Sequence, residues 1–192
     1  MRHNQIRNLE ATFLREVCHD VQLEPKLLPL TGETFTLKSA NTRPDARSDV
    51  SARGVWRTMD KTFLDVRIFH DGNKSNSGPI EKVFLSHEAE KKRVYNQRII
   101  EVEKSYFTPL VFSTSGGMGI EAAKYHKRLA TLISTKRGIP YSDAISHIRC
   151  KLRFSILKTT LTAVRGYRGT ATKWGDGINS DINLIPQQRQ FF

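Results

Sequence analysis

The sequence predicts an α/β protein in which a mixed central sheet is flanked by helices. Two adjacent runs, residues 47–56 and 61–69, are rich in β-branched and aromatic residues and predict paired strands. Segments with helical periodicity precede and follow these runs, and two more occupy the basic C-terminal part. A chain of 192 residues is long enough for one domain with a substantial core. We expect one domain over residues 1–166 and a flexible tail over residues 167–192.

The N-terminal elements follow from the spacing of apolar residues and from turn-forming composition. From residue 3 to residue 20, apolar side chains recur three or four positions apart and predict a helix. Residues 21–27 predict an edge strand, because Pro25 cannot donate a hydrogen bond to a sheet ladder. Residues 31–47 are rich in Thr, Gly, Asn, Pro and Asp and indicate a loop.

The second half of the chain predicts one more strand and three helices. Residues 86–104 predict a strongly charged helix, and residues 107–114 predict an apolar strand that runs into a Gly-rich turn. Residues 120–136 and 141–164 predict two further helices, which are basic and add to the sheet and its flanking helices at the C-terminal end. In the last helix we expect five apolar side chains to face the core: Ile145, Ile148, Leu152, Ile156 and Leu161.

Asp49, Asp65 and Arg67 are the candidate catalytic residues in the central strands. Asp49 opens the first strand run and Asp65 lies in the second, so a hairpin would bring these strands side by side. Because side chains alternate along a strand, Asp65 and Arg67 share one face. Two carboxylates on neighbouring strands are typical of a site for a hard divalent ion such as magnesium. Asp45 competes for the role of first acid, but it lies outside the strand.

Asp65 and a further acid, Glu24, can also be interpreted as structural residues. Asp65 could form an ion pair with a neighbouring Arg at a strand edge, because Asp-x-Arg is a common tripeptide. Glu24 is a third acid at a strand terminus, where a single acid is more often solvated than a ligand. The sequence leaves both alternatives open.

The charge balance predicts a polyanionic partner, most simply nucleic acid. Lys and Arg number 31 against 19 Asp and Glu, which gives a net charge of +12 and a pI near 10. Residues 120–169 contain 11 Lys or Arg and two acids, so a helical surface there could follow a phosphate backbone. The alternatives are a basic protein that needs solubility, a ribosome-like structural role, and solvated helix faces. The candidate DNA contacts are His3, Arg7, Lys91, Tyr95, Arg98, Lys151 and Arg153.

The cysteines and the apolar runs indicate an intracellular protein, nuclear if the source is a eukaryote. Cys18 and Cys150 have no motif spacing and predict buried thiols of a reducing compartment. No apolar run approaches the length of a membrane span, and residues 1–15 lack the apolar core of a signal peptide. We therefore expect no membrane association, while the oligomeric state stays open.

Several short motifs, in this order, resemble those of a known nuclease family. The chain is similar, over roughly residues 2–166, to the restriction-endonuclease-like, or PD-(D/E)XK, nuclease domains found with reverse transcriptases of non-long-terminal-repeat retrotransposons. The blocks that carry the resemblance are His3-Asn4-Gln5-Ile6-Arg7, Leu23-Glu24-Pro25, Arg47-Ser48-Asp49-Val50, Phe63-Leu64-Asp65-Val66-Arg67, Lys92-Arg93-Val94-Tyr95, Phe107-Thr108-Pro109-Leu110-Val111 and Gly116-Gly117-Met118-Gly119.

The resemblance implies an endonuclease that cuts double-stranded DNA with Mg²⁺ or Mn²⁺ and that works with a reverse transcriptase of the same element. Asp49 and Asp65 would be metal ligands, and Glu24 would be the third acid that orients the metal or its water. Arg67 stands where the superfamily usually has Lys. An Arg can stabilise charge on a phosphate, but it is a poor general base because it stays protonated. Lys61, on the same strand face, could substitute for the missing Lys.

Two other functions compete with the endonuclease. One is a nuclease fold that has kept DNA binding and lost cleavage, either as a binding module or as a decayed retroelement remnant. The other is an unrelated acid-pair hydrolase such as a glycosidase, which would need an aromatic groove for sugar. Only two Trp residues and a charge of +12 argue against the glycosidase. Convergence of Glu24, Asp49, Asp65 and Arg67 in space would favour the nuclease.

Overall fold

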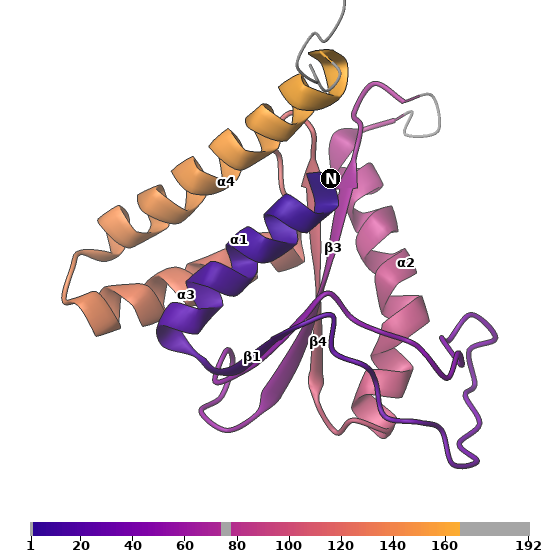
Figure 1. The fold of residues 1–192 in the computed structure, drawn as a ribbon. Helices are drawn as coiled ribbons and strands as arrows, with labels where there is room; N and C mark the ends of the chain where they lie inside the picture. The colour runs from indigo at the N-terminus through magenta and orange to yellow at the C-terminus, as the bar shows by residue number, and fades with distance from the viewer. Residues whose placement is uncertain (1, 74–77, 166–192) are drawn as a thin grey trace, which may run out of the picture.

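The chain folds into an α/β structure with one mixed sheet, as a computed structural model shows for residues 2–73 and 78–165 (Figure 1). The predicted tail, residues 167–192, lies outside the described residues. The elements in chain order are α1 (Arg2–Val17), β1 (His19–Leu23), β2 (Val50–Arg53), β3 (Lys61–Phe69), α2 (Ile80–Glu101), β4 (Tyr106–Ser113), α3 (Ile120–Arg137) and α4 (Tyr141–Arg165).

The sheet is open and has the strand order β1-β2-β3-β4. β1 pairs with β2 and β2 with β3 in antiparallel fashion, while β3 and β4 run parallel. The predicted hairpin of β2 and β3 is confirmed, with Val50 opposite Leu64 and Arg53 opposite Lys61. A parallel pair needs a long crossover, and α2 supplies it between β3 and β4. This crossover determines which helix can reach the face of β3 that carries Asp65.

Helices cover both faces of the sheet, and β3 contributes apolar side chains to the core on each side. Figure 1 shows α1, α3 and α4 on one side and α2 on the other. Leu64 and Val66 pack into the main core with α1, α3 and α4, whereas Phe63 and Phe69 belong to two smaller clusters with α2. The period-2 alternation predicted for this strand is therefore confirmed by its packing.

Several boundaries differ from the prediction. The first strand ends at Leu23 instead of continuing to residue 27. α2 begins at Ile80, six residues before the predicted start, directly after Pro79, and its first turn carries Glu81. A proline is tolerated where a helix begins, because the first amides have no partner within the helix. None of the described helices combines the length and apolarity that a membrane span requires.

The inward face of α4 is mostly as predicted, with one exception. Ile145, Ile148, Leu152 and Ile156 are buried in the main core. Leu161 is 44% exposed and was wrongly assigned to the core. It lies on the opposite side of the helix, together with other exposed apolar side chains and with Cys150, which was wrongly predicted to be buried.

Candidate active site

Asp49 is held against β3 by hydrogen bonds that its own backbone and side chain make. It immediately precedes β2, and its amide donates to the Leu64 carbonyl at 3.2 Å. Its carboxylate Oδ2 accepts from the amide of Val66 at 2.6 Å. The side chain thus takes the place of a backbone acceptor at the end of the β2–β3 ladder, which fixes the first acid next to Asp65.

His3, at the start of α1, lies against the Asp49 carboxylate. Its Nε2 is 2.9 Å from Asp49 Oδ2 and 3.1 Å from the carbonyl oxygen of Val66. The hydrogen bond with Asp49 is the main cause that raises the pKa of His3, although partial burial opposes it. The negative charge of Asp65 also contributes to this increase. His3 was predicted as a phosphate contact, and the structure places it on the first acid.

Asp65 is a buried acid that faces α2. Only 4% of the residue is exposed, and Nζ of Lys91, from α2, lies 2.5 Å from its Oδ2. The pKa of Asp65 is raised to about 6: burial is the largest cause, the charge of Lys91 lowers the pKa, and the charge of Asp49 raises it. The Asp49 carboxylate lies at the amide of Val66, the residue next to Asp65, so the two acids are neighbours along β3. Asp65 therefore has a pKa close to neutral pH, and its side chain lies near a second acid and a lysine.

Arg67 shares the face of Asp65, as predicted, and is also bound by α2. Its Nη1 donates to Oε2 of Glu90 at 2.6 Å. His87, one turn earlier on the helix, has Nδ1 3.9 Å from the same oxygen. The pKa of His87 is lowered, first by burial and second by the charge of Arg67. Glu90 thus neutralises Arg67, and the neighbouring Lys91 neutralises Asp65.

The sequence did not predict that residues of α2 pair with Asp65 and Arg67. Glu90 was not a candidate, and Lys91 was a candidate only for phosphate contact. The structural alternative for Asp65 was an ion pair with an Arg, whereas the observed partner is Lys91. Consecutive residues Glu90-Lys91 carry charges opposite to those of Arg67 and Asp65, which is the signal that could have linked helix and strand.

Glu24 approaches Asp49 through its backbone, but its carboxylate is occupied elsewhere. Its amide donates to the Asp49 carbonyl at 2.9 Å, and its φ of 49° places it in the left-handed region. The half-exposed carboxylate pairs with Arg7 and lies 3.8 Å from Nη1 of Arg47. Arg7, another predicted DNA contact, is thus bound to the predicted third acid.

The described residues contain no group of three or more His, Cys, Asp or Glu side chains arranged to hold a metal ion. Of the predicted ligands, Asp49 and Asp65 remain, and each has a basic partner: His3 at Asp49 and Lys91 at Asp65. Magnesium is usually held by one or two carboxylates together with substrate phosphate. Asp49 and Asp65 fit that donor set, since their repulsion and the raised pKa of Asp65 are relieved by a cation.

Tyr95, another predicted DNA contact on α2, also has structural partners. Tyr95 is partly buried, its ring centroid lies 5.5 Å from that of Phe107, and Nζ of Lys91 is 5.8 Å from the Tyr95 ring. The pKa of Tyr95 is raised by burial and then by the charges of Asp65 and Asp49, so this ring borders the acid pair.

Arg98 was wrongly predicted as a DNA contact, because it is fully buried. Its Nη1 donates to the carbonyls of Asn41 at 2.9 Å and Arg43 at 2.8 Å, and its Nη2 donates to Leu28 at 2.7 Å. A guanidinium with these acceptors has no surface left for a phosphate. It instead fixes the segment that connects β1 to β2 against α2.

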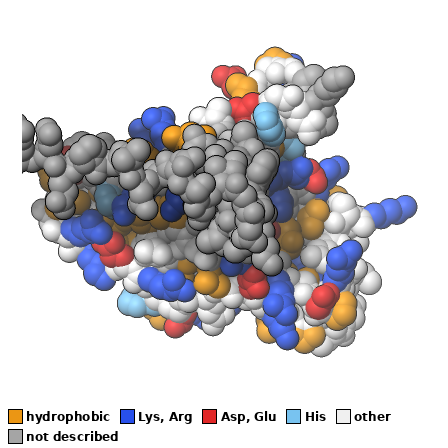
Figure 2. Space-filling view, turned by 45° about the horizontal axis from the view of Figure 1, so that its top comes forward, with side chains coloured by type: hydrophobic (Ala, Val, Ile, Leu, Met, Phe, Trp, Pro, Cys, Tyr) orange, Lys and Arg blue, Asp and Glu red, His pale blue; other side chains and the backbone are white. Residues whose placement is uncertain are grey.

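The remaining predicted residues lie away from the acid pair. Lys61 Nζ is 4.6 Å from the ring of Phe63, at the beginning of β3. Lys151 and Arg153 are exposed on α4, which packs on α1 and α3 and is separated from Asp65 by the sheet. Figure 2 shows that Lys and Arg side chains are spread over the visible face and interspersed with acids.

This geometry supports chemistry at an anionic, partly buried site next to lysine. It can hold a divalent cation at two carboxylates, place an ammonium beside it, and attract phosphate through surrounding basic residues. No family model matches the chain, and a search of curated proteins finds no match.

Proposed function

We propose that the protein is an endonuclease that hydrolyses the phosphodiester backbone of double-stranded DNA with Mg²⁺ or Mn²⁺. The observation that carries this proposal is the contact of Lys91, from α2, with Asp65, while the Asp49 carboxylate accepts a hydrogen bond from the next residue of β3. The resemblance to nucleases associated with reverse transcriptases supplies the reaction class, and a reverse transcriptase of the same element as partner rests on that resemblance alone. A glycosidase has no comparable support.

Asp49 and Asp65 would hold the metal ion, and their environment suits this role. Asp49 is oriented by the Val66 amide, and Asp65 is placed by its position in the middle of β3. Burial and mutual repulsion disfavour two free carboxylates here, and a divalent cation offsets both effects. When bound, such an ion can polarise a phosphoryl oxygen and acidify a water molecule. In the proposal, Glu24 supports the site from outside by fixing the Asp49 carbonyl.

Lys91 is the lysine that we assign to this site in place of Lys61. It already contacts Asp65, while Lys61 lies over the Phe63 ring. A lysine near a buried acid can orient a water molecule or a phosphate and can exchange a proton, whereas Arg67 stays protonated. Because Glu90 holds Arg67, Arg67 serves to position α2 beside β3 and keeps Lys91 at Asp65.

DNA binding in this proposal begins with the basic residues that surround the acid pair. His3, Arg7 and Arg47 lie on the Asp49 side, and their charges would attract the phosphates that flank the scissile bond. Lys151 and Arg153 remain predicted contacts on another face of the molecule. Phosphate contacts of this kind predict an affinity that falls steeply as salt concentration rises.

One observation favours the second candidate, a nuclease fold that binds DNA without cutting it. The carboxylate of Glu24 is paired with Arg7, and the described residues contain no three-residue metal cluster. A site with only two acids and a neutralised Arg67 would bind metal weakly. Nicking assays separate the two candidates.

The test is conversion of supercoiled plasmid to nicked circle, with magnesium and with chelator. We expect Asp49→Asn and Asp65→Asn to abolish nicking while DNA affinity stays equal or increases, because negative charges near phosphate are removed. Lys91→Met should lower the nicking rate by about a hundredfold or more, which is the usual size of a lost acid–base or electrostatic contribution. Asp45→Asn, at an exposed acid outside the site, is the matched control.

Arg67→Lys distinguishes the two basic residues of the site. If Lys91 is the functional lysine, Arg67→Lys retains nicking, since Glu90 can also pair with Lys. Nicking that persists in chelator would contradict a metal mechanism. An inactive native protein that gains nicking as Arg67→Lys would support the remnant and would refute the role of Lys91.

A further inference from the structure

The outer face of α4 carries a row of exposed apolar side chains. Phe154 is 67%, Leu157 53% and Leu161 44% exposed, and Cys150 is exposed one turn before them. The spacing from Cys150 to Leu161 is four, three and four residues, which is the alternation of a coiled-coil seam. The opposite face of α4 is already buried in the main core. A helix with two apolar faces predicts a second packing partner.

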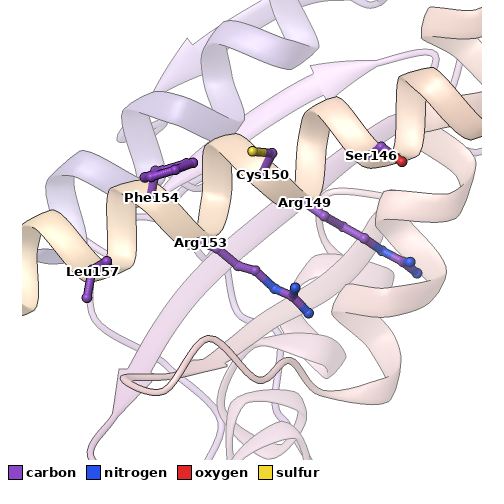
Figure 3. Close-up of a pocket in the computed structure, with 6 residues that line it drawn as sticks. All are labelled: Ser146, Arg149, Cys150, Arg153, Phe154 and Leu157. Atoms are coloured by element: carbon purple, nitrogen blue, oxygen red, sulfur yellow. The ribbon is translucent and has the colours of Figure 1, made fainter.

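The row borders a hollow that could receive a side chain of such a partner. This hollow has a volume of about 490 Å³, and the described residues that line it all belong to α4: Ser146, Arg149, Cys150, Arg153, Phe154 and Leu157. Figure 3 shows Cys150 and Phe154 pointing away from the two arginines, which extend together toward one side of the helix. The apolar row therefore has basic side chains beside it instead of over it.

The flanks of this row are basic on both sides. In the seam register, Lys151 and Lys158 follow the apolar positions on one flank, and Arg153 lies on the other. All three are exposed. After Asp143, in its first turn, α4 contains no Asp or Glu. Flanking charges of a single sign select a partner of the opposite sign.

We propose that this face of α4 binds an amphipathic helix of another protein, with apolar residues at the matching seam positions and acidic residues on its flanks. Two α4 helices would place Lys and Arg against each other, so a second copy is disfavoured. Residues 166–192 of this chain carry three Lys or Arg against two Asp, so they lack the acidic charge of the partner. Nucleic acid would use the basic residues but would leave Leu157 and Leu161 without an apolar partner.

The surface is separate from the proposed nuclease site. α4 packs on α1 and α3, whereas Asp65 and Lys91 face α2 across the sheet. A bound helix would therefore leave the acid pair accessible. It would cover Lys151 and Arg153, which are the residues predicted to contact DNA.

The experiment uses the complete chain and a fluorescent synthetic peptide of about four heptads, with Leu at the seam positions and Glu on both flanks. A peptide with Lys in place of Glu is the charge control. We expect the acidic peptide to bind and the basic peptide to bind at least about tenfold more weakly. Leu157→Asn should weaken the acidic peptide about tenfold or more, because it places an amide in the apolar seam without changing net charge.

Matched variants separate specific docking from general attraction to a basic protein. Leu85→Asn, at an apolar residue of α2 that is 49% exposed, should leave peptide affinity unchanged. Lys158→Glu should weaken the acidic peptide more than Lys127→Glu, an exposed change of equal charge on α3. Since Leu157 and Leu85 are both half-exposed, the midpoint of thermal unfolding should stay near that of the native protein.

Cys150 provides a readout that reports the location of binding. It is exposed at the start of the row, whereas Cys18 is buried, so a thiol reagent should label Cys150 first in the folded protein. Bound acidic peptide should slow this labelling, and Leu157→Asn should abolish the protection. Absence of binding, or binding without protection, would overturn the proposal. So would a dimer that Leu157→Asn dissociates, or single-stranded DNA that protects Cys150 better than the acidic peptide does.

Discussion

Asp65 is expected to destabilise the folded protein at neutral pH. Its pKa rises from 3.8 to about 6, chiefly because it is buried. A rise of this size corresponds to about 3 kcal/mol. Because the folded state binds the proton of Asp65 more tightly than the unfolded state does, protonation of Asp65 stabilises the folded protein. This stabilisation is fully present below pH 3.8 and is lost as pH rises through 6. Above pH 6 the ionised carboxylate therefore costs the folded state about 3 kcal/mol.

The perturbation is Asp65→Asn, which keeps the size of the side chain and removes its titration. Urea unfolding between pH 4 and pH 8, in the presence of chelator, measures the free energy of unfolding without any metal contribution. We expect the difference in stability between pH 4 and pH 7 to change by up to about 3 kcal/mol relative to the native protein, with the variant more stable at pH 7. Asp45→Asn, at an exposed acid, should leave the native pH profile unchanged.

Lys91→Met tests the opposite change at the same pair. Lys91 lowers the pKa of Asp65, so its removal should shift the pH-dependent loss of stability to higher pH than 6. If Asp65→Asn is less stable than the native protein at pH 7, the ion pair with Lys91 outweighs burial and the reasoning is refuted. A pH profile that Asp65→Asn leaves unchanged would refute it equally, since Asp65 would then not titrate in this range.

Three further predictions concern other named contacts. Gly119→Ala should lower the free energy of unfolding by about 2 kcal/mol in a urea titration, because the added Cβ would lie 2.1 Å from Glu88 Oε1. That oxygen accepts a hydrogen bond from the amide of Glu121 at the start of α3, and the clash would displace it. An unchanged midpoint would contradict this prediction. Arg98→Met should cost about 3 kcal/mol or more in the same assay, because three carbonyls lose their donor, while the salt dependence of DNA affinity should stay the same. The NMR pKa of His3 should fall in Asp49→Asn, because the hydrogen bond with the carboxylate is its main cause, and a pKa that stays the same would exclude that contact.

The arrangement of the central strands could be predicted from the sequence because it depends on local regularities. Alternation of side chains places Asp65 and Arg67 on one face, and the short connection after β2 brings Asp49 next to β3. Both features follow from the period of a strand and from chain length. The α/β class follows in the same way, since helical and strand periodicities alternate along the chain.

The partners of these residues depended on how α2 packs, which no local pattern specifies. The apolar residues of this charged helix are spread around its circumference, so the sequence does not show which side of the helix faces the sheet. Lys91 and Arg98 were therefore both predicted to be exposed DNA contacts. Packing of α2 against β3 and β4 turned Lys91 toward Asp65, while the segment between β1 and β2 closed over Arg98. The sequence alone determined that Asp49 lies next to β3, because the two central strands are close in the chain. Only the tertiary structure decided which cation faces them, because that contact joins residues far apart in sequence and is set by the packing of the whole core.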